Sequence, residues 1–268
     1  LAQGELPEEA EALNDLGVIY YTEARSTEDK EEKDRLLGRA LELFRQALQK
    51  DPALVTAINN LGLIELERGN LEAALAKFNE ALALEPEYAR ALNNRGLAYR
   101  RLAQRTTDEA AREDLFAKAK ADFLAGIAKE PETADLHYNL ALLEEDNLKN
   151  PVAAAEQYRK TVELDPRNAT ALNNLSVFLQ ESESTAERQE AVLLARRAVE
   201  IRPAEACMVD TLARALLAAG DCANALETAN RAIELQSKGA GRLRCNQEEI
   251  RSLPKQIEAQ CPALSNGA

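Results

Sequence analysis

Residues 55–86 read VTAINNLGLIELERGNLEAALAKFNEALALEP and contain two short amphipathic segments on either side of Arg68-Gly69-Asn70. Ala, Leu, Glu, Lys and Arg, which are strong helix formers, dominate the chain as a whole. The apolar residues of the two segments recur at the spacing of one helix face, and the closing Pro86 cannot continue a helix. The stretch therefore predicts two antiparallel helices that end at a proline.

Variants of this unit fill most of the chain. A proline follows a charged residue and an apolar helix end at intervals of 34, 45, 35 and 37 residues, at Pro52, Pro86, Pro131, Pro166 and Pro203. The tetrad at 59–62, Asn-Asn-Leu-Gly, returns as Asn-Asn-Arg-Gly at 93–96 and as Asn-Asn-Leu-Ser at 173–176. Such internal periodicity is typical of repeat architectures, and strands are not expected because no alternating β-branched run occurs.

The unit resembles the tetratricopeptide repeat, which carries Leu-Gly and an aromatic residue on its first helix and Ala, an aromatic residue, Ala and Pro on its second. The first unit shows this pattern as Leu16-Gly17, Tyr20, Ala40, Phe44, Ala47 and Pro52. The resemblance implies an all-α, right-handed α-solenoid. We place its repeats within residues 1–238, at about 8–54, 55–88, 89–133, 134–168, 169–205 and 206–238. Arg95 departs from the pattern, since an apolar residue is usual there.

Two of the repeats are longer than the others. Gly17 and Ala40 are 23 residues apart, as are Gly96 and Ala119, whereas Gly62 and Ala74 are separated by 12. The extra 11 residues equal about three helical turns, so both helices can lengthen with their buried faces in phase. The charged inserts at 26–35 and 106–114 are therefore expected to form solvated helical extensions; contact with a partner is the alternative.

Residues 239–268 are expected to form a capping helix and tail, with the helix broken or kinked at Pro254. A cap that runs parallel to the first helix of the sixth repeat would bring Cys245 near Cys207 and Cys261 near Cys222. Two disulfides, Cys207–Cys245 and Cys222–Cys261, are thus one hypothesis, and they imply a periplasmic or secreted protein. Buried free thiols in a cytoplasmic protein are the alternative.

Composition argues against several classes of function. The 33 Lys and Arg residues face 46 Asp and Glu residues, a net charge of −13, which opposes binding to nucleic acid. No apolar run approaches the roughly 20 residues of a membrane span. There is one histidine, His137, which we expect to be packed, and neither a Cys-x-x-Cys pair nor a glycine-rich phosphate loop occurs. We therefore expect no enzyme activity, no cofactor and no metal site.

The repeated asparagines are the candidate binding residues. In the family that the repeats resemble, the first helices line a concave groove, and an asparagine before Leu-Gly points into it. Four residues hold this position: Asn60, Asn94, Asn139 and Asn174. They resemble the asparagine ladder in the superhelix of O-linked N-acetylglucosamine transferase, which grips peptide backbone. An amide donates and accepts hydrogen bonds at once, so it can pair with a peptide group whatever the ligand sequence.

Further residues beside the ladder are candidates for peptide contacts: Asn59, Asn93, Tyr138 and Asn173. Arg90 and Arg101 form part of a basic stripe on the first helix of the third repeat, which suits an acidic peptide or a carboxylate. Two alternatives remain open. The asparagines can instead bond the backbone of neighbouring helices and shape the superhelix, and the arginines can pair with the acidic inserts.

These observations favour a non-catalytic scaffold that binds an extended peptide or protein segment in its groove. The first alternative is a structural subunit of an envelope, secretion or pilus assembly that uses its convex face. The second is a substrate-recruiting module of a larger enzyme. The sequence specifies neither the partner nor the oligomeric state.

Overall fold

The computed structural model describes residues 5–239 and 246–262. All regular elements in these ranges are helices. Their bounds are α1 (Glu5–Ser26), α2 (Lys30–Lys50), α3 (Val55–Arg68), α4 (Leu71–Leu84), α5 (Ala89–Arg105), α6 (Glu109–Lys129), α7 (Ala134–Asp146), α8 (Pro151–Leu164), α9 (Ala169–Gln180), α10 (Thr185–Ile201), α11 (Ala206–Ala218), α12 (Cys222–Ser237) and α13 (Gln247–Gln260). The chain forms two compact units, Leu1–Leu143 and Glu144–Ala268.

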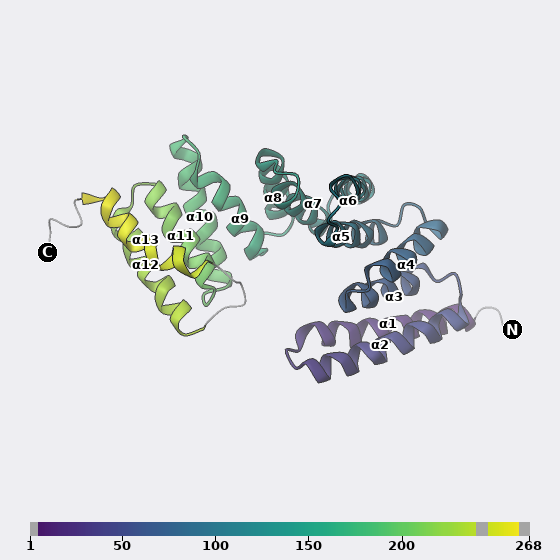
Figure 1. Cartoon of the computed structure of the whole chain (residues 1–268). Coiled ribbons are helices and arrows are strands. Elements are labelled where there is room, and N and C mark those ends of the chain that lie inside the picture. Colours follow the sequence, from purple (N-terminus) through teal and green to yellow (C-terminus); the bar gives the residue numbers. More distant parts are fainter. Residues whose placement is uncertain (1–4, 240–245, 263–268) are drawn as a thin grey trace. The chain divides into compact units, whose positions relative to one another are not determined.

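The helices are arranged as consecutive hairpins (Figure 1). In the first unit α1 packs on α2, α3 on α4, and α5 on α6, while α2–α3 and α4–α5 contacts join one hairpin to the next. In the second unit α9 packs on α10 and α11 on α12, and α13 lies against α12 and α11. Helices α3 to α12 lie two by two in the five expected ranges from 55–88 to 206–238, while α1 begins at Glu5, before the first range at about 8–54. The fold is the predicted all-α repeat solenoid.

Prolines set the ends of the second helices. The residue before each of these prolines is the C-cap of its helix and has a non-helical ψ between 73° and 97°: Asp51, Glu85, Glu130, Asp165 and Arg202. Proline disfavours helical backbone in the residue before it, which explains these ends. The turn inside the second hairpin depends on Gly69, whose φ of 78° is left-handed and suits glycine.

Each of the first three hairpins is closed by a glycine against a phenylalanine ring. A Cβ atom on Gly17, Gly62 or Gly96 would lie 2.5, 2.5 or 2.6 Å from a ring carbon of the facing phenylalanine. These rings belong to Phe44, Phe78 and Phe123, all fully buried. The helices of each hairpin can approach this closely because glycine has no side chain at the crossing.

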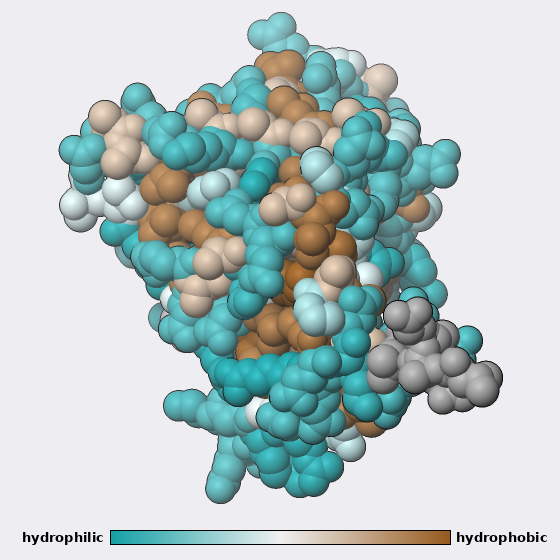
Figure 2. Space-filling model, turned by 90° about the vertical axis from the view of Figure 1, so that its right-hand side faces the viewer, coloured by the Kyte–Doolittle hydropathy of each residue, from teal (hydrophilic) through white to brown (hydrophobic). Residues whose placement is uncertain are grey.

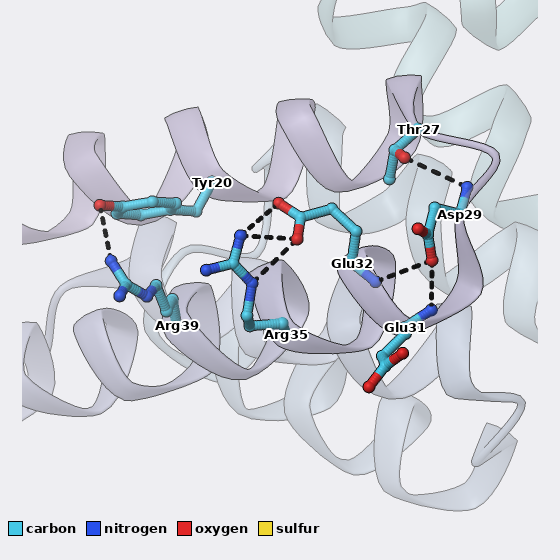
Figure 3. Close-up of polar contacts among 7 residues, drawn as sticks. All are labelled: Tyr20, Thr27, Asp29, Glu31, Glu32, Arg35 and Arg39. Carbon is cyan, nitrogen blue, oxygen red and sulfur yellow. Dashed lines mark hydrogen bonds and ion pairs between the residues drawn. The ribbon is translucent and has the colours of Figure 1, made fainter.

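Helices α1 and α2 are the longest hairpin, with 22 and 21 residues, and their free end is polar as expected. Figure 3 shows Asp29 in the connection, where its Oδ1 accepts hydrogen bonds from two backbone N–H groups at the start of α2, at 2.9 and 3.2 Å. Arg35 binds Glu32 one turn away. Arg39 crosses to α1, lies over the ring of Tyr20 and donates to its hydroxyl at 3.3 Å.

Helix α13 is a cap on the last hairpin. It buries Ile250, Leu253 and Ile257, and Cys261 at its C-cap is joined to Cys222 at the start of α12. The expected break at Pro254 is wrong: α13 is a single helix with this proline inside. The buried face on one side and the disulfide at the end hold the helix together despite the lost hydrogen bond. Cys207 is also disulfide-bonded, but its expected partner, Cys245, lies outside the described residues.

The surface carries several exposed apolar side chains among its charges. Figure 2 shows one face, on which brown apolar patches interrupt a mostly hydrophilic surface. Among the described residues, the large apolar side chains that are exposed are Leu16, Val18, Ile19, Leu84, Leu124, Val152 and Leu193. No helix in the same ranges is both long and apolar enough to cross a bilayer.

The glycine–phenylalanine contact leads to a first prediction. Gly62→Ala should lower the free energy of unfolding by roughly 1–3 kcal/mol, because its Cβ would overlap the buried Phe78 ring. Gly38→Ala is the matched control. Gly38 lies in the middle of α2, and no atom is within 4 Å of a Cβ added there. This change should therefore raise the free energy of unfolding by about 0.5–1 kcal/mol. Urea unfolding followed by circular dichroism measures both, and equal effects would contradict the packing argument.

The cap leads to a second prediction. Replacing Cys222 and Cys261 together by serine should destabilise the second unit by roughly 2–4 kcal/mol, since the disulfide closes a sequence separation of 39 residues. The unfolding of both proteins in urea, without reductant, measures the difference. Alkylation followed by intact-mass measurement tests the bond directly: labelling of Cys222 or Cys261 in the native, unreduced protein would show that it does not form.

Candidate functional site

A cavity of about 650 Å³ opens on the surface of the first unit, along the first helix of each hairpin. Residues of α1, α3, α5 and the start of α7 line most of it, and the C-cap of α6 adds Glu130. Its side chains are mainly amides and hydroxyls, with Val18 and Leu63 as apolar contacts and Tyr21 and Tyr88 as aromatic ones. We refer to this cavity as the amide groove.

Five of the predicted peptide-binding residues line the amide groove: Asn59, Asn60, Asn93, Asn94 and Arg90. The asparagines reach it because each pair lies two and three residues before a hairpin glycine, Gly62 or Gly96. The glycine faces the second helix of its own hairpin. Asn60 and Asn94, two residues earlier, lie about 200° around the helix and point away from that partner, whereas Asn59 and Asn93, three residues earlier, lie about 60° from the glycine side. The packing contact thus sets the direction of the amides.

The amides also bond to one another from repeat to repeat. Three of the four ladder asparagines donate their Nδ2–H to the Oδ1 of an asparagine in the preceding repeat: Asn60 to Asn14 at 2.9 Å, Asn94 to Asn59 at 2.9 Å, and Asn139 to Asn93 at 2.8 Å. The acceptors Asn14 and Asn59 are buried. The partners are side chains, whereas the structural alternative drawn from the sequence had placed them in the backbone.

These bonds leave part of each amide for other partners. A side-chain amide has two N–H donors and two acceptor sites, and the inter-repeat bond uses one donor of each of these three asparagines. Asn60 and Asn139 are partly exposed, whereas Asn94 is only 8% exposed. The geometry therefore allows a ladder residue to hold the stack and still contact a ligand, with Asn60 better placed than Asn94.

Asn14 was missed in the sequence reasoning. It stands three residues before Gly17, as Asn59 does before Gly62, but Asp15 replaces the second asparagine of the pair. Alignment on the glycine alone would have revealed it. Thr56 and Thr133 also line the groove, and nothing in their sequence context singled them out.

The ladder changes in the second unit. Asn174 donates to the Tyr158 hydroxyl at 2.9 Å, and that hydroxyl donates to the Glu145 carboxylate. The fourth repeat has Tyr138, not an asparagine, at the position of Asn93, and the phenol that Asn174 binds belongs to Tyr158 on α8. The Oδ1 of Asn173 is buried without a hydrogen-bond partner among the described residues.

The arginines of α5 have separate roles. Arg101 donates to the Leu66 carbonyl oxygen at 3.1 Å, which satisfies a carbonyl at the end of α3, and it does not line the groove. Arg95 makes two hydrogen bonds to Asp122 of α6, at 2.8 and 2.7 Å. Because Asp122 is buried, this ion pair explains how an arginine occupies a usually apolar position.

The charges around the amide groove are mostly acidic. Asp15, Glu130 and Asp135 line it, against the single cation Arg90. Burial and the nearby Glu67 raise the pKa of Tyr21 to about 12, so its hydroxyl stays neutral at physiological pH. The groove is therefore suited to neutral or basic ligands, whereas the basic stripe predicted from the sequence had favoured acidic ones.

His137 is packed, as expected. Its ring is buried, and Nε2 lies 3.0 Å from the Pro131 carbonyl oxygen. In the described part of the chain, no three His, Cys, Asp or Glu side chains gather in a way that could hold a metal ion.

Comparison with known proteins identifies the repeats. Residues 62–102 match the family model described as TPR repeat, and residues 107–169 match that described as tetratricopeptide repeat. No curated protein is significantly similar in sequence. These matches and the hairpin fold define a helical-repeat protein of the kind that generally serves as a protein-interaction scaffold. The two matches and the helical-repeat fold support a tetratricopeptide-repeat protein.

Solved structures of low sequence identity share the fold. TTC0263, a thermophilic TPR protein of Thermus thermophilus, is 22% identical with a TM-score of 0.60, over 78% of this chain and 99% of that one. Pseudomonas aeruginosa pilF is 19% identical with a TM-score of 0.68, over 86% and 93%. YrrB, described as a TPR protein with an unusual peptide-binding site, is 22% identical with a TM-score of 0.57, over 74% and 94%.

The inter-repeat amide bonds lead to a third prediction. Asn94→Ala should destabilise the first unit by roughly 1–3 kcal/mol, because it leaves the buried Oδ1 of Asn59 without its donor. In the double variant with Asn59→Ala, the loss in free energy of unfolding should be smaller than the sum of the losses of the two single variants. The difference should be about 0.5–1.5 kcal/mol.

Urea unfolding of the four proteins measures this coupling. Asn230→Ala, at an exposed position on α12, is the control and should change stability by less than about 0.5 kcal/mol. Strictly additive losses for Asn59 and Asn94 would show that the bond between them contributes nothing.

Proposed function

We propose that this protein is a non-catalytic scaffold that binds an extended segment of a partner protein in the amide groove. The observation that carries the proposal is the groove itself: a cavity of about 650 Å³ lined by side-chain amides from successive repeats. Peptide groups repeat along an extended chain and need both donors and acceptors, which amide side chains supply together.

The size of the groove sets the length of the segment. Its lining includes α1, α3, α5 and the start of α7. Neighbouring helices lie about 8–10 Å apart, so the lined distance is roughly 25–30 Å. An extended chain covers about 3.3 Å per residue, and we therefore expect a bound segment of roughly eight or nine residues.

The composition of the lining constrains the ligand further. Three carboxylates against one arginine favour a neutral or basic segment, and Val18, Leu63 and the two tyrosines offer contact to a few apolar side chains. Peptide binding is also noted for YrrB, which shares the fold.

A second candidate is an assembly subunit that uses a different surface. A cavity of about 600 Å³ in the second unit, lined by Val152, Ala155 and Phe178 among charged side chains, favours it. Val152 is 71% exposed there, although a surface helix usually places charged residues at such positions.

The disulfide bears on location. Disulfides persist in oxidising compartments and are rare in the cytosol of mesophiles. The Cys222–Cys261 disulfide therefore supports a periplasmic or secreted location. Both proposed functions are compatible with this location.

A matched pair of substitutions tests the proposal and forms the fourth prediction. Peptides are first selected on the wild-type protein from a displayed library of random dodecapeptides. Val18→Arg places a long side chain in the amide groove without disturbing the core. It should lower the affinity for the selected peptides at least tenfold. Val152→Arg makes the same change at an exposed helix position of the second unit and should leave their affinity unchanged.

Isothermal titration calorimetry measures the affinities, and circular dichroism checks that both variants fold. Loss of binding with Val152→Arg alone would favour the second candidate. Failure to select any peptide, or equal affinity for wild type and Val18→Arg, would overturn the groove proposal.

A further inference from the structure

One face of α1 repeats a face of α3 almost residue for residue. Residues 12–19 read ALNDLGVI and residues 57–64 read AINNLGLI. Three apolar positions that share one face of the helix hold identical residues in the two segments. They are Ala12, Leu16 and Ile19 in α1 and Ala57, Leu61 and Ile64 in α3. Their environments are opposite. In α3 the exposed fractions are 0%, 7% and 0%, whereas in α1 Ala12 is exposed and Leu16 and Ile19 are 42% and 53% exposed.

The structure shows what kind of element covers this pattern. Leu61 and Ile64 belong to a buried cluster with Leu37 and Phe44 of α2, with Leu41 packed against it. The stripe on α3 is thus covered by the second helix of the preceding repeat, which presents its own row of large apolar residues. In the described part of the chain α1 packs on α2 and α3, and the exposure of Leu16 and Ile19 shows that neither helix covers the corresponding stripe.

The residues at the two ends of the exposed stripe on α1 differ from those at the ends of the equivalent stripe on α3. On α1 the row continues at helical spacing to Glu8 and to Glu23, both exposed. The corresponding residues of the second repeat are Ala53 and Arg68. Helix α1 has six acidic residues and one arginine, a net charge of −5. A basic partner therefore complements this face, while a second copy would bring carboxylates against carboxylates.

We propose that the exposed face of α1 formed by Glu8, Ala12, Leu16, Ile19 and Glu23 docks an amphipathic helix of a partner protein. The docked helix carries a leucine-rich stripe at its centre and Lys or Arg near both ends. Glu8 and Glu23 are 15 residues apart, which is about 22 Å along a helix, so the basic groups of the partner are separated by a similar distance. This face is independent of the amide groove, which Val18 lines on another side of α1.

The sequence of α2 provides the probe, because α2 covers the identical stripe on α3. A fluorescein-labelled synthetic peptide of residues 30–50, acetylated and amidated, has six basic and four acidic residues and carries the covering leucines. Fluorescence anisotropy with the full chain should show saturable binding at micromolar concentration. Leu16→Glu and Ile19→Glu should each weaken it at least tenfold.

Leu84→Glu is the matched control, since Leu84 is 51% exposed on α4 and lies outside the stripe; it should leave the affinity unchanged. The double change Glu8→Lys and Glu23→Lys should weaken binding several-fold and reduce its salt dependence. Because all these positions are exposed, circular dichroism should show intact folding. The proposal would be overturned if the peptide does not bind, or if Leu16→Glu and Ile19→Glu leave its affinity unchanged.

Sedimentation velocity of the wild-type protein tests the choice of occupant. A monomer at the concentrations used for anisotropy supports a partner helix. A dimer that disappears with Ile19→Glu would assign the face to a second copy of the chain and overturn the proposed occupant.

Discussion

In each of the first three hairpins a glycine packs against a buried phenylalanine ring, and much of the remaining structure follows from this contact. A side chain as small as a methyl group at Gly17, Gly62 or Gly96 would overlap the ring. The contact therefore fixes both the distance between the two helices and the rotation of the first helix about its axis. Because Asn60 precedes Gly62 by two residues, about 200° around the helix, that rotation turns it away from the second helix and toward the amide groove, where Asn59 lies beside it.

The amides of the groove combine two tasks that are often separate. The bonds from Asn60 to Asn14 and from Asn94 to Asn59 connect neighbouring first helices, and a buried amide without such a partner would be costly. The same side chains are among those that line the cavity. A ligand that competes for them must replace a bond that already holds two repeats together, which favours contacts through the donors and acceptors that remain.

Much of the architecture was predictable from local patterns. The helix pairs, the proline-terminated second helices and the longer polar hairpin at α1 and α2 all follow from residue spacing, since these features depend on neighbours in sequence. The continuity of α13 through Pro254 was not predictable, because it depends on burial against the last hairpin. Likewise, Arg101 resembled a ligand-binding residue in sequence, but it donates to a carbonyl of the preceding repeat.

The sequence by itself determined the repeat, its helices and the positions of the asparagines, because backbone hydrogen bonding and helical periodicity act within a few residues. Only the tertiary structure decided which polar groups pair and which apolar faces are covered. The residues Ala, Leu and Ile occupy equivalent positions on α1 and α3, yet they are exposed on one helix and buried on the other. The difference lies in the neighbour: α2 covers the stripe on α3, and burial is a property of the helix packed opposite.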